Sequence, residues 1–139
     1  MIILDTNVVS EPTQARPSRA VMNWLAAQEP ADLYTTTVTE AEIQYGIALM
    51  THGRRRHDLE TAIRGFFQSR IEDRILAFDH EAAIVFGTIT AERKKAGRPI
   101  RIFDTQIASI ARSRRAAVAT RDVGDFEHAG VRIINPWDT

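Results

Sequence analysis

The sequence predicts an α/β fold in which a central, mostly parallel sheet of about five strands is flanked by helices. Short apolar segments alternate with helical patterns along the whole chain, which is typical of strands joined by helical crossovers. The first apolar run, residues 2–4, has no polar alternation, as expected for a parallel strand covered on both faces. A length of 139 residues, 44% of them hydrophobic and 26% charged, fits one globular domain over residues 1–139.

The first half of the chain alternates between strand and helix patterns. Pro17-Ser18 begins a helix with apolar residues at helical spacing, and Pro30 ends it. β-Branched and aromatic residues then predict a strand. The next helix has apolar residues nearly all round, so we expect it to be substantially buried. The predicted elements are a strand at 2–4, a helical turn at 8–12, a helix at 19–28, a strand at 33–38 and a helix at 39–48.

The second half begins with a long amphipathic helix at 54–74. Its apolar stripe consists of Leu59, Ile63, Phe66, Phe67 and Ile71. A helix with Asp79 as its N-cap follows, and Gly97 and Pro99 end it. The remaining predicted elements are strands at 75–78, 116–119 and 131–134, a helix at 80–96, and a helix at 103–111 with Phe103, Ile107, Ile110 and Ala111 facing inward.

Composition excludes several classes of protein. The chain has no cysteine, which excludes disulfides, zinc ribbons and thiol catalysis. A formal net charge of zero argues against a generally basic nucleic-acid binder. Lysine occurs only at 94 and 95, so sixteen of the eighteen basic residues are arginine, whose planar group suits phosphate and carboxylate partners. Nothing resembles a signal peptide or a membrane span, so we expect a cytoplasmic protein with no membrane partner.

Four acidic residues occupy positions that a parallel sheet brings to one edge. Asp5 and Asp122 follow predicted strands, whereas Glu42 and Asp104 lie in the first turns of predicted helices. Ligands of open α/β sheets bind beyond the carboxyl ends of the strands. Carboxylates without nearby sulfur or imidazole ligands suit Mg²⁺ or Mn²⁺, and these ions usually act together with substrate phosphates. The pattern therefore indicates phosphodiester chemistry.

Each acid also has a purely structural explanation. Asp5 and Asp104 are good helix N-caps, and Glu42 fits a capping box with Thr39. The sequence patterns leave both explanations open.

Rival functions also place acids at strand ends. A HAD-type phosphatase requires Asp-x-Asp where this chain has Asp5-Thr6-Asn7. A response-regulator receiver requires a lysine near the site, but Lys94 and Lys95 end a predicted surface helix. A non-catalytic module that acts through a partner or DNA would not require converging acids.

The ordered set of motifs resembles the PIN-domain ribonucleases over essentially the whole chain. The resemblance is closest to VapC/FitB-type toxins of bacterial toxin–antitoxin pairs. It is carried by Ile3-Leu4-Asp5-Thr6-Asn7, Glu40-Ala41-Glu42, Phe103-Asp104-Thr105-Gln106-Ile107-Ala108, Ala119-Thr120-Arg121-Asp122 with Asp125-Phe126, and the ending Ile134-Asn135-Pro136-Trp137.

The resemblance implies a PIN-like fold and metal-dependent endonucleolytic hydrolysis of RNA. Asp5, Glu42 and Asp104 match the metal-binding acids of the family, Asp122 matches the fourth acid, and Asp125 is a less certain match. In addition, we expect Thr6, Asn7 and Thr120 to orient these carboxylates, and Arg98, Arg101 and Arg121 to contact RNA phosphates.

The expected partners also follow from the resemblance. They are an RNA substrate, a cognate antitoxin, a second copy of the chain in a homodimer, and a higher assembly with the antitoxin. We expect the apolar stripe at 59–71, together with residues 41–50, to form a helical clamp that an antitoxin segment enters.

Overall fold

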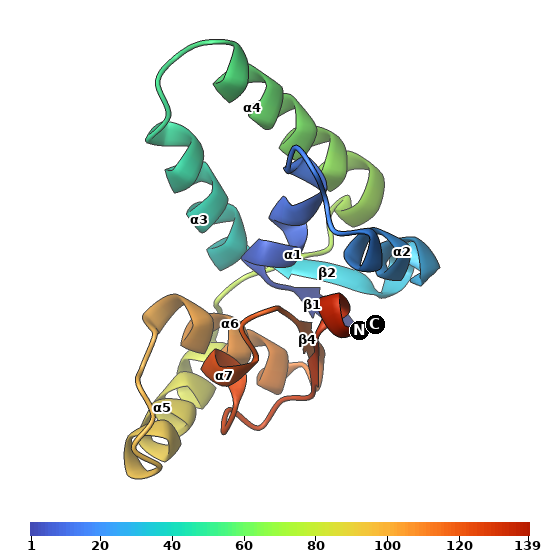
Figure 1. Ribbon diagram of the computed structural model, residues 1–139. Helices are drawn as coiled ribbons and strands as arrows, with labels where there is room; N and C mark the ends of the chain where they lie inside the picture. The colour runs from blue at the N-terminus through green and yellow to red at the C-terminus, as the bar shows by residue number, and fades with distance from the viewer.

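A computed structural model describes residues 1–139 and contains a five-stranded sheet with helices on both faces (Figure 1). The strand order is β3-β2-β1-β4-β5 and every neighbouring pair is parallel, which confirms the predicted fold class. Because β1 is central, the residue that follows it lies in the middle of the carboxyl edge. The strands are β1 (Ile2–Leu4), β2 (Leu33–Thr36), β3 (Ile75–Leu76), β4 (Ala117–Ala119) and β5 (Ile133–Ile134).

Two hydrophobic clusters cover the two faces of the sheet. Successive strand residues point to opposite faces, so Ile3 packs with the helices α5 to α7 and Leu4 packs with α1 to α4. Figure 1 shows these two groups of helices on opposite sides of β1 and β2. The helices are α1 (Thr6–Ser10), α2 (Arg19–Ala27), α3 (Thr37–Ala48), α4 (Arg54–Phe66), α5 (His80–Lys95), α6 (Ile102–Ser113) and α7 (Val123–Phe126).

Short helical turns complete the chain. They are the 3₁₀ turns η1 (Glu11–Thr13), η2 (Pro30–Asp32) and η4 (Pro136–Asp138), and the π-helical turn η3 (Phe67–Ile71). No helix combines the length and the apolar character that crossing a membrane would require.

The boundary between β2 and α3 differs from the prediction. The strand ends at Thr36 because the Thr36 hydroxyl accepts a hydrogen bond from the Thr39 N–H at 3.1 Å and caps the helix. Thr39 therefore lies inside α3 and is not its N-cap. The proposed capping box of Thr39 with Glu42 is wrong, which leaves the Glu42 carboxylate available for other partners.

Three predictions about helix faces and lengths are also wrong. The helix expected over 54–74 ends at Phe66, and the π-helical turn that follows stops where Glu72 takes a positive φ of 54°. Helix α3 is not substantially buried, since Tyr45 is 67% exposed and only Val38, Thr39, Ile43 and Ile47 of the helix are buried. Phe103, expected inward, is 56% exposed, because the face that Ile107 buries against the sheet does not extend to the first turn of α6.

Candidate active site

Asp5 lies between β1 and α1 and is only 3% exposed. One carboxylate oxygen accepts the Thr6 backbone N–H at 2.8 Å, so Asp5 is indeed the N-cap of α1. The other accepts the Thr120 hydroxyl at 2.7 Å, which ties β1 to the end of β4. Burial raises the pKa of Asp5 to about 6, although both hydrogen bonds oppose this shift. Asp5 therefore both caps α1 and connects β1 to the end of β4.

Helix α3 brings Glu42 to the same place. The Thr6 hydroxyl donates to the Glu42 carboxylate at 2.8 Å and links α1 to α3. Burial raises the pKa of Glu42 as well. Glu40, two residues earlier, instead lines a groove between α3 and α4. The fold therefore separates two glutamates that the sequence alone leaves easy to confuse.

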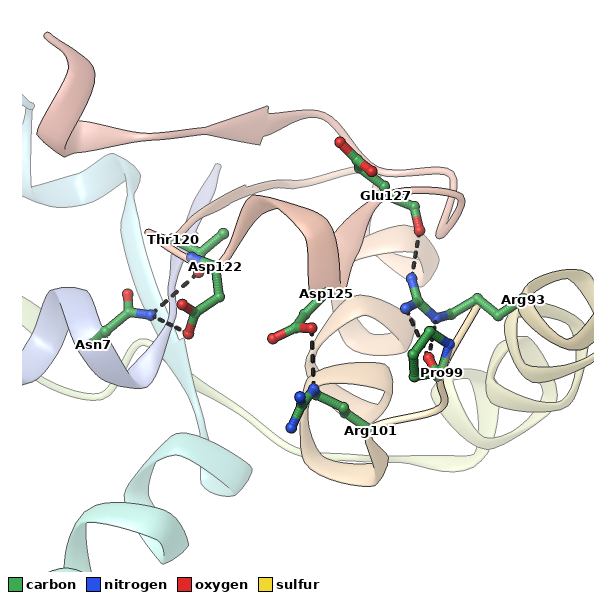
Figure 2. Close-up of polar contacts among 8 residues, drawn as sticks. All are labelled: Asn7, Arg93, Pro99, Arg101, Thr120, Asp122, Asp125 and Glu127. Carbon is green, nitrogen blue, oxygen red and sulfur yellow. Dashed lines mark hydrogen bonds and ion pairs between the residues drawn. The ribbon is translucent and has the colours of Figure 1, made fainter. Parts of the chain in front are cut away.

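Asn7 connects α1 to the turn that follows β4. Its side-chain amide donates to the Asp122 carboxylate at 3.0 Å, and its carbonyl oxygen accepts the Arg121 backbone N–H at 3.2 Å. The Thr120 hydroxyl, which donates to Asp5, also accepts the Asp122 backbone N–H at 3.0 Å. Figure 2 shows Asn7, Thr120 and Asp122 gathered at this turn. The three residues expected to orient the acids, Thr6, Asn7 and Thr120, all touch them.

Asp104 lies in the first turn of α6 but is not its N-cap, since Arg101 holds that position. Burial, together with the charges of nearby Asp5, Asp125, Glu42 and Asp122, raises the pKa of Asp104 to about 7. No hydrogen-bond donor of the protein offsets these effects. The four predicted acids and Asp125 therefore lie within electrostatic reach of one another.

The arginines predicted to contact phosphate have two kinds of partner. Arg101 pairs with Asp125 at 3.1 Å (Figure 2), and Arg98 pairs with Glu127 at 3.4 Å. Arg121 lies over the Trp137 ring, with its guanidinium carbon 5.0 Å from the ring centroid. Arg98 and Arg101 thus already have acidic partners, and Arg121 has an aromatic one.

Sequence reasoning missed Arg93, which is 2% exposed. Its guanidinium donates to the Pro99 carbonyl at 3.0 and 2.8 Å and to the Glu127 carbonyl at 2.5 Å (Figure 2). It thereby joins the loop before α6, which leads to Asp104, to the end of α7, which carries Asp125. The available signal was its spacing, because Arg93 falls four residues after the buried Ile89 on the same helix.

The predicted helical clamp corresponds to a groove between α3 and α4 with a volume of 760 Å³. Ile63 and Phe67 of the predicted stripe line it, opposite Ile43 and Ile47 of α3. Phe66 and Ile71 do not line the groove; they lie in the hydrophobic core, to which Ile43, Ile47 and Ile63 also belong.

The acid cluster matches a hard divalent cation in the chemistry of its donors. All the donors are carboxylate oxygens. Burial and mutual repulsion raise the pKa values of Asp5 and Asp104, so a nearby cation would stabilise their ionised forms. As the side chains stand, no three of them converge closely enough to hold an ion. Ion binding would therefore require the carboxylates to turn toward one another.

Comparisons with known proteins agree with this architecture. A family model described as PIN domain matches residues 2–131. The VapC ribonuclease Y4jK of Sinorhizobium fredii is 41% identical over 99% of both chains, and the toxin FitB of Neisseria gonorrhoeae is 36% identical over 99% of both. The crystal structure of FitAcB from Neisseria gonorrhoeae superimposes with a TM-score of 0.92 at 36% identity, covering 100% of each chain.

Proposed function

Because this chain belongs to the PIN domain family, we propose that it is an endoribonuclease acting as the toxin of a toxin–antitoxin pair. The observation that carries the proposal is the group of partly buried carboxylates at the carboxyl edge of the sheet, two of which have pKa values raised to about 6 and about 7. Ionised carboxylates this close together destabilise the fold unless a cation offsets their repulsion, and groups with such shifted pKa values are typical of functional sites. We assign the substrate as the phosphodiester backbone of RNA.

Asp5, Glu42, Asp104 and Asp122 would hold the cation, Mg²⁺ or Mn²⁺. Once bound, the cation would supply the charge neutralisation and water activation that phosphodiester hydrolysis requires. Asp125 is left as the weaker choice for the fourth acid because Arg101 already pairs with it.

The remaining residues of the site act by fixing these carboxylates. Thr120 and the Thr6 backbone each donate a hydrogen bond to one oxygen of Asp5 and so restrict the orientation of this side chain. The Thr6 hydroxyl holds Glu42, and the Asn7 amide holds Asp122. Residues that orient charged ligands in this way typically contribute about tenfold to hundredfold in activity.

The groove between α3 and α4 supports the proposed antitoxin partner. Apolar Ile43, Ile47, Ile63 and Phe67 line it, as an inserted amphipathic segment requires. Co-expression with the product of the neighbouring gene should yield a stable complex. Its absence would remove the antitoxin assignment and leave the nuclease assignment intact.

A homodimer in the cytoplasm completes the proposal. The exposed apolar side chains of Ile84, Ile102 and Phe103 on α5 and α6 supply surface for an interface between copies. Light scattering at micromolar concentration should therefore report twice the chain mass of 15.6 kDa. A monomer alone would contradict this part.

Cleavage of bulk RNA by the purified protein, with and without EDTA, tests the function. We expect cleavage with Mg²⁺ or Mn²⁺, none with EDTA, and a loss of at least about a hundredfold in Asp5→Asn. Asp32→Asn is the control, since Asp32 is an exposed acid before β2, at the opposite end of the strands. No metal-dependent cleavage by the wild-type protein would end the nuclease assignment and favour a non-catalytic module that acts through a partner or DNA. Full activity in Asp5→Asn would instead remove Asp5 from the catalytic site.

A further inference from the structure

A hollow of 590 Å³ lies beside the acid cluster, between the α1–η1 segment and the turn after β4. Asn7, Gln14, Arg16 and Arg121 line it. Glu11 also contributes, but its carboxylate accepts the Ser18 backbone N–H at 2.7 Å at the start of α2. The Glu11 carboxylate keeps its negative charge, so two arginines against one acid leave the lining of the hollow with a net positive charge.

Arg121 is held in a way that suits phosphate binding. Its guanidinium carbon lies over the Trp137 ring, 5.0 Å from the ring centroid, and this contact limits its motion without using its N–H donors. Arg98 and Arg101, on the other side of the cluster, instead direct donors to Glu127 and Asp125. An oriented guanidinium with free donors loses little conformational entropy when it binds a planar or tetrahedral anion.

The hollow is directly joined to the acids. Asn7 lines the hollow while its amide donates to Asp122 at 3.0 Å. The Asn7 carbonyl oxygen accepts the Arg121 backbone N–H, and Arg121 immediately precedes Asp122 in the chain. An anion in the hollow would thus lie beside a phosphate placed at the carboxylates.

We propose that this hollow binds the RNA backbone flanking the cleaved bond, with Arg121 and Arg16 as phosphate contacts and Trp137 as the platform that orients Arg121. The assignment deepens the proposed ribonuclease function and rests on it. In this arrangement the RNA strand runs over the surface from the carboxylates toward α1 and η1. The arginines paired with Glu127 and Asp125 contribute less to affinity than this side does.

Equilibrium binding of a fluorescein-labelled single-stranded RNA in EDTA tests the hollow without cleavage. Each phosphate contact on a single strand contributes about 0.7 to the slope of log affinity against log salt. We expect Arg121→Gln and Arg16→Gln each to weaken binding by about fivefold to tenfold and to lower the slope by about 0.7. Trp137→Leu keeps both charges, so it should weaken binding by less and leave the slope unchanged.

Arg132→Gln is the matched control, because Arg132 is an exposed arginine before β5, at the opposite end of the strands. Its affinity and slope should equal those of the wild-type protein. Circular dichroism should show every variant folded at the temperature of the assay. If Trp137→Leu does not fold, the two arginine variants still decide the outcome.

Three outcomes would overturn the proposal. The first is a wild-type salt slope in Arg121→Gln with only a lower melting temperature, which would mean that the Arg121–Trp137 contact serves stability alone. The second is an equal loss of affinity in Arg132→Gln. The third is no RNA binding by the wild-type protein.

The two proposals fail in different ways. RNA binding with the predicted slopes but no cleavage with Mg²⁺ would remove the nuclease assignment and leave the hollow as a binding site. Metal-dependent cleavage with an unchanged KM in Arg121→Gln would remove the hollow and leave the nuclease.

Discussion

The starts of helices α1 and α6 each bring one acid to the same edge of the sheet, but they surround the two carboxylates differently. Asp5, at the start of α1, is almost fully buried and accepts hydrogen bonds from Thr120 and from the Thr6 backbone. Asp104, at the start of α6, is half-buried, and its pKa is raised by burial and by four neighbouring acids. Its pKa reaches about 7, whereas that of the more deeply buried Asp5 reaches about 6.

The difference shows that burial alone does not set the cost of an ionised carboxylate. Hydrogen bonds to the charged form offset part of the desolvation of Asp5, and nothing comparable offsets that of Asp104. The α1 side of the site is therefore organised by the protein itself. On the α6 side no hydrogen bond offsets the burial of Asp104, and the buried Arg93 holds the loop that leads to this residue.

Arg93→Met should produce the largest change in stability. It leaves the Pro99 and Glu127 carbonyls without their donor, so we expect the free energy of unfolding to fall by about 2–4 kcal/mol. Urea denaturation measures the change. Arg112→Met is the control, since it removes only the outer Arg112–Glu92 ion pair between α6 and α5, worth less than about 1 kcal/mol. Equal losses in the two variants would show that Arg93 does not anchor the α6 side.

Thr120→Val tests the α1 side. The valine removes the hydroxyl that donates to Asp5, so the pKa of Asp5 should rise further, and the free energy of unfolding should fall by about 1–2 kcal/mol. Ribonuclease activity should fall by about tenfold to hundredfold. Thr90→Val is the matched control, because the buried Thr90 hydroxyl has no hydrogen-bond partner and its loss should be neutral or stabilising. Unchanged activity in Thr120→Val would contradict the orienting role of this hydroxyl.

The pH dependence of stability should show how much the ionised acids destabilise the metal-free protein. Both pKa values are raised from 3.8, so the folded state binds more protons than the unfolded state between about pH 4 and pH 7. The contribution of these two groups to stability in EDTA should therefore be complete below about pH 4 and should be lost as the pH rises to about 8. A melting temperature that rises steadily from pH 5 to pH 8 would oppose this account.

Removing either charge should reduce that loss. At pH 8 in EDTA we expect Asp104→Asn to gain about 1 kcal/mol, or roughly 3–6 °C in melting temperature, after allowing for its partial exposure. Asp5→Asn should also melt higher than the wild type but gain less, because the amide disturbs the hydrogen bonds to the carboxylate. Both should lose most of the Mg²⁺-induced shift. A larger gain for Asp5→Asn would reverse the comparison between the two sides.

The smallest effect concerns the choice between Asp122 and Asp125. Asp125→Asn breaks a partly exposed pair with Arg101, so stability should change by less than about 1 kcal/mol and the Mg²⁺-induced shift should persist. Asp122→Asn should instead lose most of that shift, as Asp104→Asn does. Melting curves with Mg²⁺ titrated against each variant make the comparison. The opposite pattern would make Asp125 the fourth acid.

The sequence by itself determined the succession of strands and helices along the chain and the positions of the acids relative to them. Apolar runs and helical periodicity are local patterns, and they were enough to predict five strands and a parallel sheet. Since parallel strands share a carboxyl edge, the same patterns also brought Asp5 and Asp122 together. The family motifs favoured Glu42 over Glu40, a choice that local periodicity could not make.

Only the tertiary structure decided which partner each polar side chain has. The contact of Thr6 with Glu42 and the pairing of Arg98 and Arg101 with acids join segments far apart in the chain, which local patterns do not specify. The burial of Arg93 likewise depends on two carbonyls, one of them 34 residues away in the chain. Hydrogen bonds and charge effects act within a few ångströms, so their partners are settled only when the packed chain brings distant residues to that range.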